Sequence, residues 1–74
     1  MSTARDEINH IAETFEWAVS EPLLAKDPYM YHKGVSVIAV RFGPRGGLYW
    51  GEMPERDIAW SDDLKKVLEW FKEG

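Results

Sequence analysis

Residues 35–53, VSVIAVRFGPRGGLYWGEM, decide the fold of this chain. Two largely apolar runs, 35–42 and 48–53, flank the sequence GPRGG at 43–47. β-branched and aromatic side chains favour strands, and a five-residue connection that contains Pro and Gly is typical of a hairpin loop. The segment therefore predicts two antiparallel strands joined by a loop at 43–47.

The loop assignment fixes which side chains share a face of this hairpin. It places Phe42 opposite Leu48, and side chains then alternate between the two faces of the sheet. We expect the more apolar face to be core, which makes Trp50 a structural residue. That face holds Ile38, Val40, Phe42, Leu48 and Trp50.

The second face of the hairpin is also poor in polar residues. It holds Val35, Val37, Ala39, Arg41, Tyr49, Gly51 and Met53. A solvated sheet face should be largely polar, so this composition predicts cover by a helix or by a second molecule.

Two helices are expected to flank the sheet. Residues 4–19 carry apolar side chains at i, i+3, i+4 and i+7. Thr3 is expected to cap this helix and Pro22 to end it, because the residue before a proline avoids helical geometry. Residues 62–73 show the same spacing, with Ser61 as the expected cap.

The resulting order, α-β-β-(β)-α, predicts a two-layer α+β fold in which a small antiparallel sheet of two to four strands packs with N-terminal and C-terminal helices. The additional strands are expected at 29–32 and near 57–60. A length of 74 residues fits one small domain, 1–74, with a thin core.

The composition excludes several classes of protein. Thirteen acidic against nine basic residues give a net charge of −4, which opposes general attraction to nucleic acid or anionic lipid. The chain has no cysteine, so it has no disulfides and no thiolate zinc site, as suits a cytoplasmic protein. Neither a secretory signal nor a membrane span is expected from the pattern of apolar residues.

An acidic face of the first helix is the leading candidate for a binding surface. Opposite the apolar stripe lie Asp6, His10, Glu13 and Trp17, with Glu16 beside them. At 100° per residue Trp17 is about 180° from Ile8, so it is expected on the polar side. An indole among carboxylates suits contact with a basic protein surface. Alternatively, Trp17 folds back beneath the segment 22–31.

The evidence for catalysis or metal binding is weak. Asp6, His10 and Glu13 have the spacing to reach one metal ion, but a solvated helix face with a weak Asp6–His10 pair explains them equally. No cysteine is available as a nucleophile, and no serine lies in a nucleophile-elbow context. We therefore expect no enzyme activity, no metal and no cofactor.

The hairpin loop offers a rival function. Arg45 lies at its tip, and Arg41, Tyr49 and Lys33 are expected nearby. Arginine next to aromatic rings is a common way to hold single-stranded nucleic acid. The negative net charge makes direct nucleic-acid binding the less favoured interpretation.

These observations predict a non-enzymatic protein-interaction module whose partner has a basic surface. The candidate contact residues are Asp6, His10, Glu13, Glu16, Trp17, Arg41, Arg45 and Tyr49. In size, charge and compactness, though not in any motif, the chain is similar to anti-CRISPR proteins and other inhibitors from phages and mobile elements. That similarity implies a carboxylate-lined helix that occupies a basic surface of a nucleic-acid-handling host protein. The alternatives are a nucleic-acid-binding domain that uses Arg45 and a homodimeric structural subunit joined through the sheet face.

Overall fold

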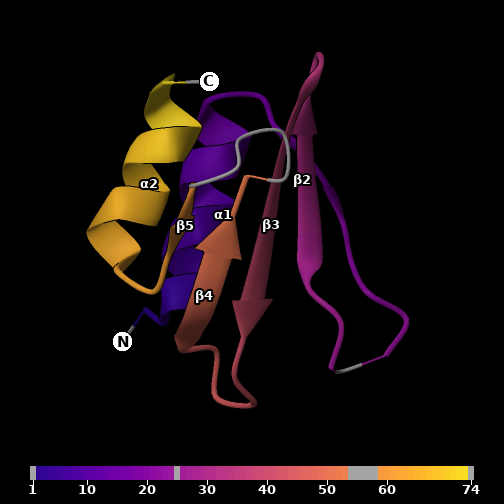
Figure 1. Ribbon diagram of the computed structural model, residues 1–74, viewed down its shortest axis with the longest axis vertical. Helices are drawn as coiled ribbons and strands as arrows, with labels where there is room; N and C mark the ends of the chain where they lie inside the picture. Colours follow the sequence, from indigo (N-terminus) through magenta and orange to yellow (C-terminus); the bar gives the residue numbers. More distant parts are fainter. Residues whose placement is uncertain (1, 25, 54–58, 74) are drawn as a thin grey trace.

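The computed structural model describes residues 2–24, 26–53 and 59–73. It confirms the α+β class, but five strands form the sheet in these ranges rather than two to four (Figure 1). In chain order the elements are α1 (Ala4–Thr14), β1 (Ala18–Ser20), β2 (Tyr29–Lys33), β3 (Ser36–Phe42), β4 (Leu48–Glu52), β5 (Trp60–Ser61) and α2 (Leu64–Glu73).

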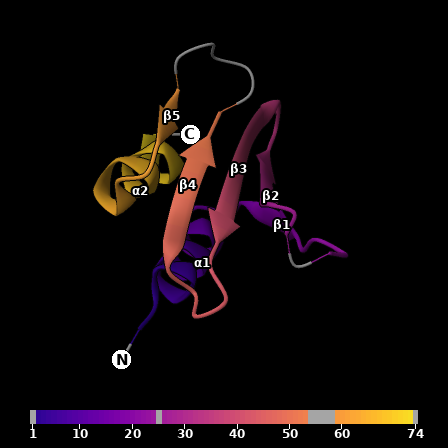
Figure 2. The ribbon, with the colours of Figure 1, turned by 60° about the horizontal axis from the view of Figure 1, so that its bottom comes forward.

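The sheet is an antiparallel meander in which each strand pairs with its neighbours in sequence, in the order β1-β2-β3-β4-β5. Both helices lie on one side of it, and within the part of the chain that the structure describes no helix covers the other side (Figure 2). The strand expected at 29–32 is confirmed as β2. The edge strand expected near 57–60 is β5 at Trp60–Ser61, and residues 57 and 58 lie outside the described residues. The sequence pattern did not predict β1.

A β-bulge corrects the expected register of the central hairpin. The loop at 43–47 and the pairing of Phe42 with Leu48 are confirmed, but the next pair is Arg41 with Trp50. Tyr49 is therefore an extra residue on β4, which defines a bulge. Beyond it every β4 side chain points to the face opposite the expected one, because a one-residue slip exchanges the two faces. Trp50 was wrongly assigned to the core and lies on the helix-free face instead.

The bulge brings Gly51 to the face beneath α2. A Cβ at this position would lie 2.8 Å from Val67 Cγ2 and 3.4 Å from Trp70 Cζ3. The absent side chain lets α2 approach the backbone of β4. Met53, also expected on the second face, packs against the core instead.

Helix α1 begins as expected and ends five residues early. Thr3 and Asp6 form a capping box at its start. The helix stops at Thr14, so Pro22 does not end it. The end is a Schellman motif, in which Glu16 N–H donates to Glu13 O at 3.2 Å and Trp17 N–H donates to Ala12 O at 2.7 Å. Glu16 takes the left-handed conformation (φ 65°) that the motif requires.

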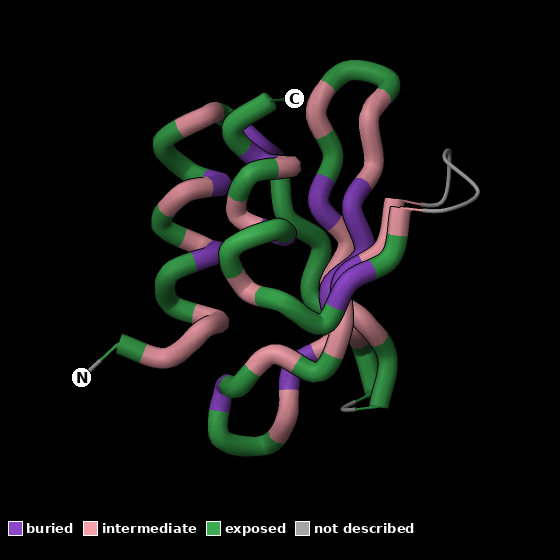
Figure 3. The backbone as a smooth tube through the Cα atoms, turned by 60° about the vertical axis from the view of Figure 1, so that its left-hand side comes forward, coloured by how far each residue is buried: buried purple, intermediate pink, exposed green. Residues whose placement is uncertain are grey.

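The early end of α1 turns Trp17 into the core, which corrects its expected place on the polar face. Its side chain is 5% exposed, and its indole Nε1–H donates to the Phe71 carbonyl at 3.0 Å. Phe71 packs edge-on against both Trp17 and Tyr31, with ring centroids 5.3 Å and 4.9 Å apart. The core lies between the helices and the sheet (Figure 3). Its buried members are Ile8, Ala12, Trp17, Tyr31, Ile38, Val40, Phe42, Val67 and Phe71.

Helix α2 begins two residues later than expected. The Asp63 carboxylate accepts a hydrogen bond from Lys65 N–H at 3.0 Å, while the Ser61 hydroxyl accepts one from Asp63 N–H at 2.9 Å. Asp63 thus occupies the cap position that was expected for Ser61. Among the described residues, no helix has the length and apolar character needed to cross a membrane.

The bulge can be tested with two glycine variants. Gly51→Ala should lower the free energy of unfolding by about 1–3 kcal/mol, because the added methyl group overlaps Val67. Gly47→Ala is the control: a Cβ there meets nothing within 4 Å, so a change within about 0.5 kcal/mol is expected. Urea denaturation measures both. Equal losses of stability in the two variants would contradict the bulge and support the unbulged register, in which residue 51 faces away from α2.

Candidate binding surfaces

The carboxylates of α1 lie in two separate places. Asp6, His10, Glu13 and Glu16 are all exposed. Asp6 belongs to the first turn, where its carboxylate accepts a hydrogen bond from Thr3 N–H at 3.3 Å. Glu13 and Glu16 lie at the other end of the helix, so the four predicted residues do not form one site.

Glu13 and Glu16 line a groove between α1 and β1, which we call the acidic groove. Its volume is about 620 Å³. Val19, at its β1 side, is 48% exposed. The other lining residues are Asn9, Ala12, Trp17, Ala18 and Tyr31. Apart from Asn9 these are apolar or aromatic, so the groove has an apolar floor with carboxylates along one rim.

Tyr31 anchors the inner wall of the acidic groove. Its side chain is fully buried, and its hydroxyl donates to Asn9 Oδ1 at 2.5 Å. Burial raises the pKa of the Tyr31 phenol well above its ordinary value of about 10, because the phenolate would lose its hydration. The Tyr31 hydroxyl is therefore a structural donor at neutral pH rather than a proton carrier.

The helix-free face of the sheet is the second candidate surface. The pairing register places on it Met30, His32, Val37, Ala39, Arg41, Trp50, Glu52 and Trp60. Trp60 is 55% exposed, and Tyr49, at the bulge beside Arg41, is 52% exposed. Arg41 and Tyr49 were expected on this face, whereas Trp50 and Trp60 were not. Trp50 was missed because the bulge leaves no sequence signal.

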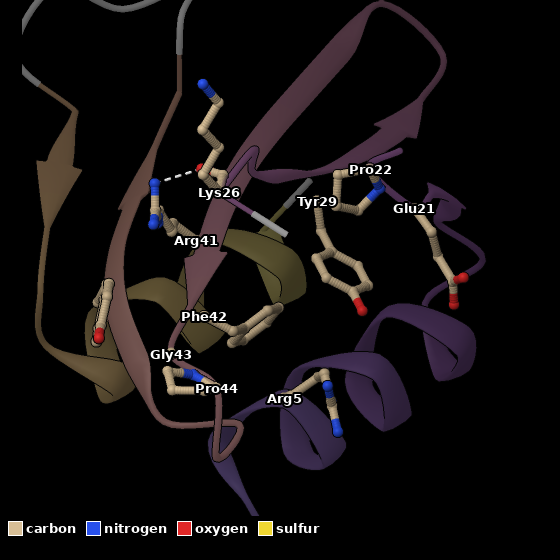
Figure 4. Close-up of a pocket in the computed structure, with 10 residues that line it drawn as sticks. Arg5, Glu21, Pro22, Lys26, Tyr29, Arg41, Phe42, Gly43 and Pro44 are labelled. Atoms are coloured by element: carbon tan, nitrogen blue, oxygen red, sulfur yellow. Dashed lines mark hydrogen bonds between the residues drawn. The ribbon is translucent and has the colours of Figure 1, made fainter. Parts of the chain in front are cut away.

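Arg41, one of the two arginines of the predicted nucleic-acid site, is engaged within the chain. Arg41 lies in a pocket of about 520 Å³, where the rings of Tyr29 and Phe42 separate it from Arg5 (Figure 4). Its Nη1 donates to the Lys26 carbonyl, which ties the segment between β1 and β2 to β3. The Arg41 Nε is buried and has no hydrogen-bond partner within the described part of the chain.

The remaining residues of that predicted site are dispersed. Arg45 is exposed in the hairpin loop, which docks on α1 through a hydrogen bond from Arg5 N–H to Gly46 O at 2.9 Å. Lys33 pairs with Ser36 at the opposite end of β3, where its ammonium lies 6.0 Å from the Trp17 ring centroid. Lys33 therefore does not join Arg45 in a common basic surface.

Neither a metal cluster nor similarity to a known protein defines a site among the residues that the structure describes. Across residues 2–24, 26–53 and 59–73, no three His, Asp or Glu side chains lie close enough together to hold a metal ion. No protein-family model, curated protein or solved structure matches the sequence or the fold.

The buried phenol predicts a specific loss of stability at high pH. The unfolded chain ionises tyrosine near pH 10, whereas folded Tyr31 stays neutral, so its contribution is complete below pH 10 and falls as the pH rises. Tyr31→Phe should lose about 1 kcal/mol at pH 7, with the hydrogen bond to Asn9. Between pH 10 and 11.5 its stability should fall less steeply than that of the wild type.

Urea denaturation from pH 7 to 11.5 measures this difference in slope. Tyr49→Phe is the matched control for the loss of one phenol, since the Tyr49 side chain is half exposed. Parallel curves for the wild type and Tyr31→Phe would contradict the assignment.

Proposed function

We propose that this chain is a protein-binding module that acts by contact rather than by catalysis, and that the acidic groove receives a basic part of its partner. The observation that supports this is the combination of an apolar floor, a rim formed by Glu13 and Glu16, and an exposed neighbouring strand. Apolar contact supplies affinity in such a groove, while the carboxylates select a cationic partner.

The two carboxylates of the acidic groove lie at the C-terminal end of α1. Glu13 lies in the last turn of α1 and Glu16 two residues beyond it, and that turn contains no basic residue. The C-terminus of a helix carries partial negative charge, so acidic side chains there are unfavourable for the isolated fold. The same arrangement adds to the negative potential that a cationic partner meets in the groove.

The partner class follows from this charge. Proteins that handle nucleic acid expose basic surfaces, and a small acidic protein is suited to occupy one of them. We therefore propose an inhibitor of such a host protein, of the phage or mobile-element type, that acts in the cytoplasm. Trp17 no longer contributes an exposed contact, so the proposal depends on Glu13 and Glu16 and on the groove floor.

The first test compares two double variants with the same change in charge. Partners are captured from a nuclease-treated host lysate with the tagged chain, and the affinity of a purified partner is then measured at several salt concentrations. Glu13→Gln with Glu16→Gln should weaken binding about five- to tenfold and reduce its salt dependence, as expected for two partly exposed charge pairs. Glu69→Gln with Glu73→Gln, on exposed positions of α2, should bind like the wild type.

Two results would count against the acidic groove. Equal weakening by both double variants would mean that net charge, rather than the groove, sets the affinity. Loss of capture after nuclease treatment would instead indicate a contact through nucleic acid, with Arg45 as the residue to change.

A second candidate function is self-association through the helix-free face. The apolar side chains at its centre and the half-exposed Trp60 and Tyr49 are unusual for a solvated sheet face. Arg41 and Glu52 lie on neighbouring strands of this face, so a copy related by a two-fold axis can offset one charge with the other. A sheet of this width and length offers about 500 Å² per copy, close to the lower limit for a stable interface.

Sedimentation between about 10 and 500 μM tests this second candidate. The wild type should shift toward a dimer with increasing concentration, and Trp60→Glu should remain a monomer because a charge then lies within the contact. Val35→Glu is the control, since Val35 is exposed in the turn between β2 and β3. A wild type that is monomeric throughout this range would exclude the dimer.

A further inference from the structure

We infer that the partner is bound as an extended segment that adds a strand to the outer edge of β1, with basic side chains in the acidic groove. This inference rests on the proposed function and specifies the binding mode and the kind of partner. It predicts a flexible, lysine- or arginine-containing segment rather than a folded basic surface.

The first support is the free edge of the sheet. Among the described strands, β1 is the outermost and pairs with β2 alone. All three of its residues, Ala18, Val19 and Ser20, are exposed. Within the described residues, its backbone hydrogen bonds go to β2 and to no other element. An edge strand directs its remaining N–H and C=O groups outward, where an added strand can bond to them.

The opposite edge of the sheet is less suited to this role. β5 has two residues, and its second residue, Ser61, is buried. The chain continues from β5 into α2 after two further residues, and α2 packs against β5. The comparison therefore favours β1 as the edge for an added strand.

The second support is the place of the acidic groove relative to that edge. Val19 pairs with the buried Tyr31, so its side chain points to the helix side of the sheet and into the groove. In an added strand, alternate side chains point to that same side. Lysine or arginine at those positions can lay its aliphatic stem on Val19 and place its charge beside Glu13 or Glu16.

The length of β1 explains why charge is needed as well. Three residues offer few backbone hydrogen bonds, and Pro22 follows two residues after the strand. Strand addition alone would therefore be weak, and the two carboxylates supply attraction as well as selectivity. A segment with acidic or small side chains at the alternate positions would gain no attraction from these carboxylates.

The experiment is an NMR titration of the ¹⁵N-labelled chain with a seven-residue peptide of alternating threonine and lysine, blocked at both ends. Saturable shifts are expected at the amides of Ala18–Ser20 and of Glu13 and Glu16. A peptide with glutamate in place of lysine is the charge control and should bind at least tenfold more weakly. Glu13→Gln with Glu16→Gln should reduce the affinity for the lysine peptide by a similar factor.

Two N-methylated peptides test strand addition itself. Backbone N–H groups of successive residues point to opposite edges of a strand, so methylating every lysine nitrogen blocks one edge and methylating every threonine nitrogen blocks the other. The added strand is expected to run antiparallel to β1, as every described pair of neighbouring strands in this sheet does. In that direction, with the lysine side chains facing the groove, only one edge of the peptide can meet β1. One methylated peptide should therefore lose binding at least fivefold, and the other should retain it.

The outcomes separate this inference from the proposed function. Binding that both methylated peptides retain, or that both lose, overturns addition at a single edge. Shifts at Glu13 and Glu16 without shifts in β1 also overturn it, while the proposed function keeps its support from charge. A lysine peptide that shifts no amide overturns the inference, and the capture experiment with the groove variants then decides the proposed function alone.

Discussion

The bond from the Trp17 indole to the Phe71 carbonyl connects the two ends of the fold. The last carbonyls of a helix have no partner within the helix, and here one of them at the end of α2 is satisfied by the turn that follows α1. The same indole packs edge-on against the Phe71 ring, which in turn contacts Tyr31 on β2. One buried cluster thus holds α1, α2 and the sheet together, and a chain of this size has room for few other long-range anchors.

The bulge at Tyr49 determines what the sheet offers on each side. Without it, Trp50 would fill the space beneath α2 and Gly51 would lie on the open face. With it, the helix rests directly on the glycine, and the aromatic side chains of β4 are turned outward. The close approach of α2 to β4 and the outward position of Trp50 are therefore two results of one extra residue in β4.

The sequence predicted those features that depend on short-range patterns. The hairpin loop at 43–47, the cap at Thr3 and the α+β class follow from turn chemistry, capping and periodicity, and the structure confirms them. The end of α1 did not follow, because Schellman motifs normally show glycine where this chain has Glu16. The bulge did not follow either, since its benefit is a contact between Gly51 and Val67 that local sequence does not encode. Each error placed a tryptophan on the wrong side of the structure. The residues expected at the binding surface therefore included Trp17, which is buried, and left out Trp50.

Glu16 connects the fold to its proposed use. A residue with a side chain costs about 1–2 kcal/mol in the left-handed conformation, and glycine at this position would avoid that cost. A glutamate there also lies at the negative end of α1, where it gains nothing from the helix dipole. The early end of α1 leaves β1 uncovered, and Glu16 places a carboxylate over the apolar floor beside that edge. In the complex that we propose, a cationic strand against β1 would offset these two local costs, which is why we favour the acidic groove over the outer sheet face as the binding site.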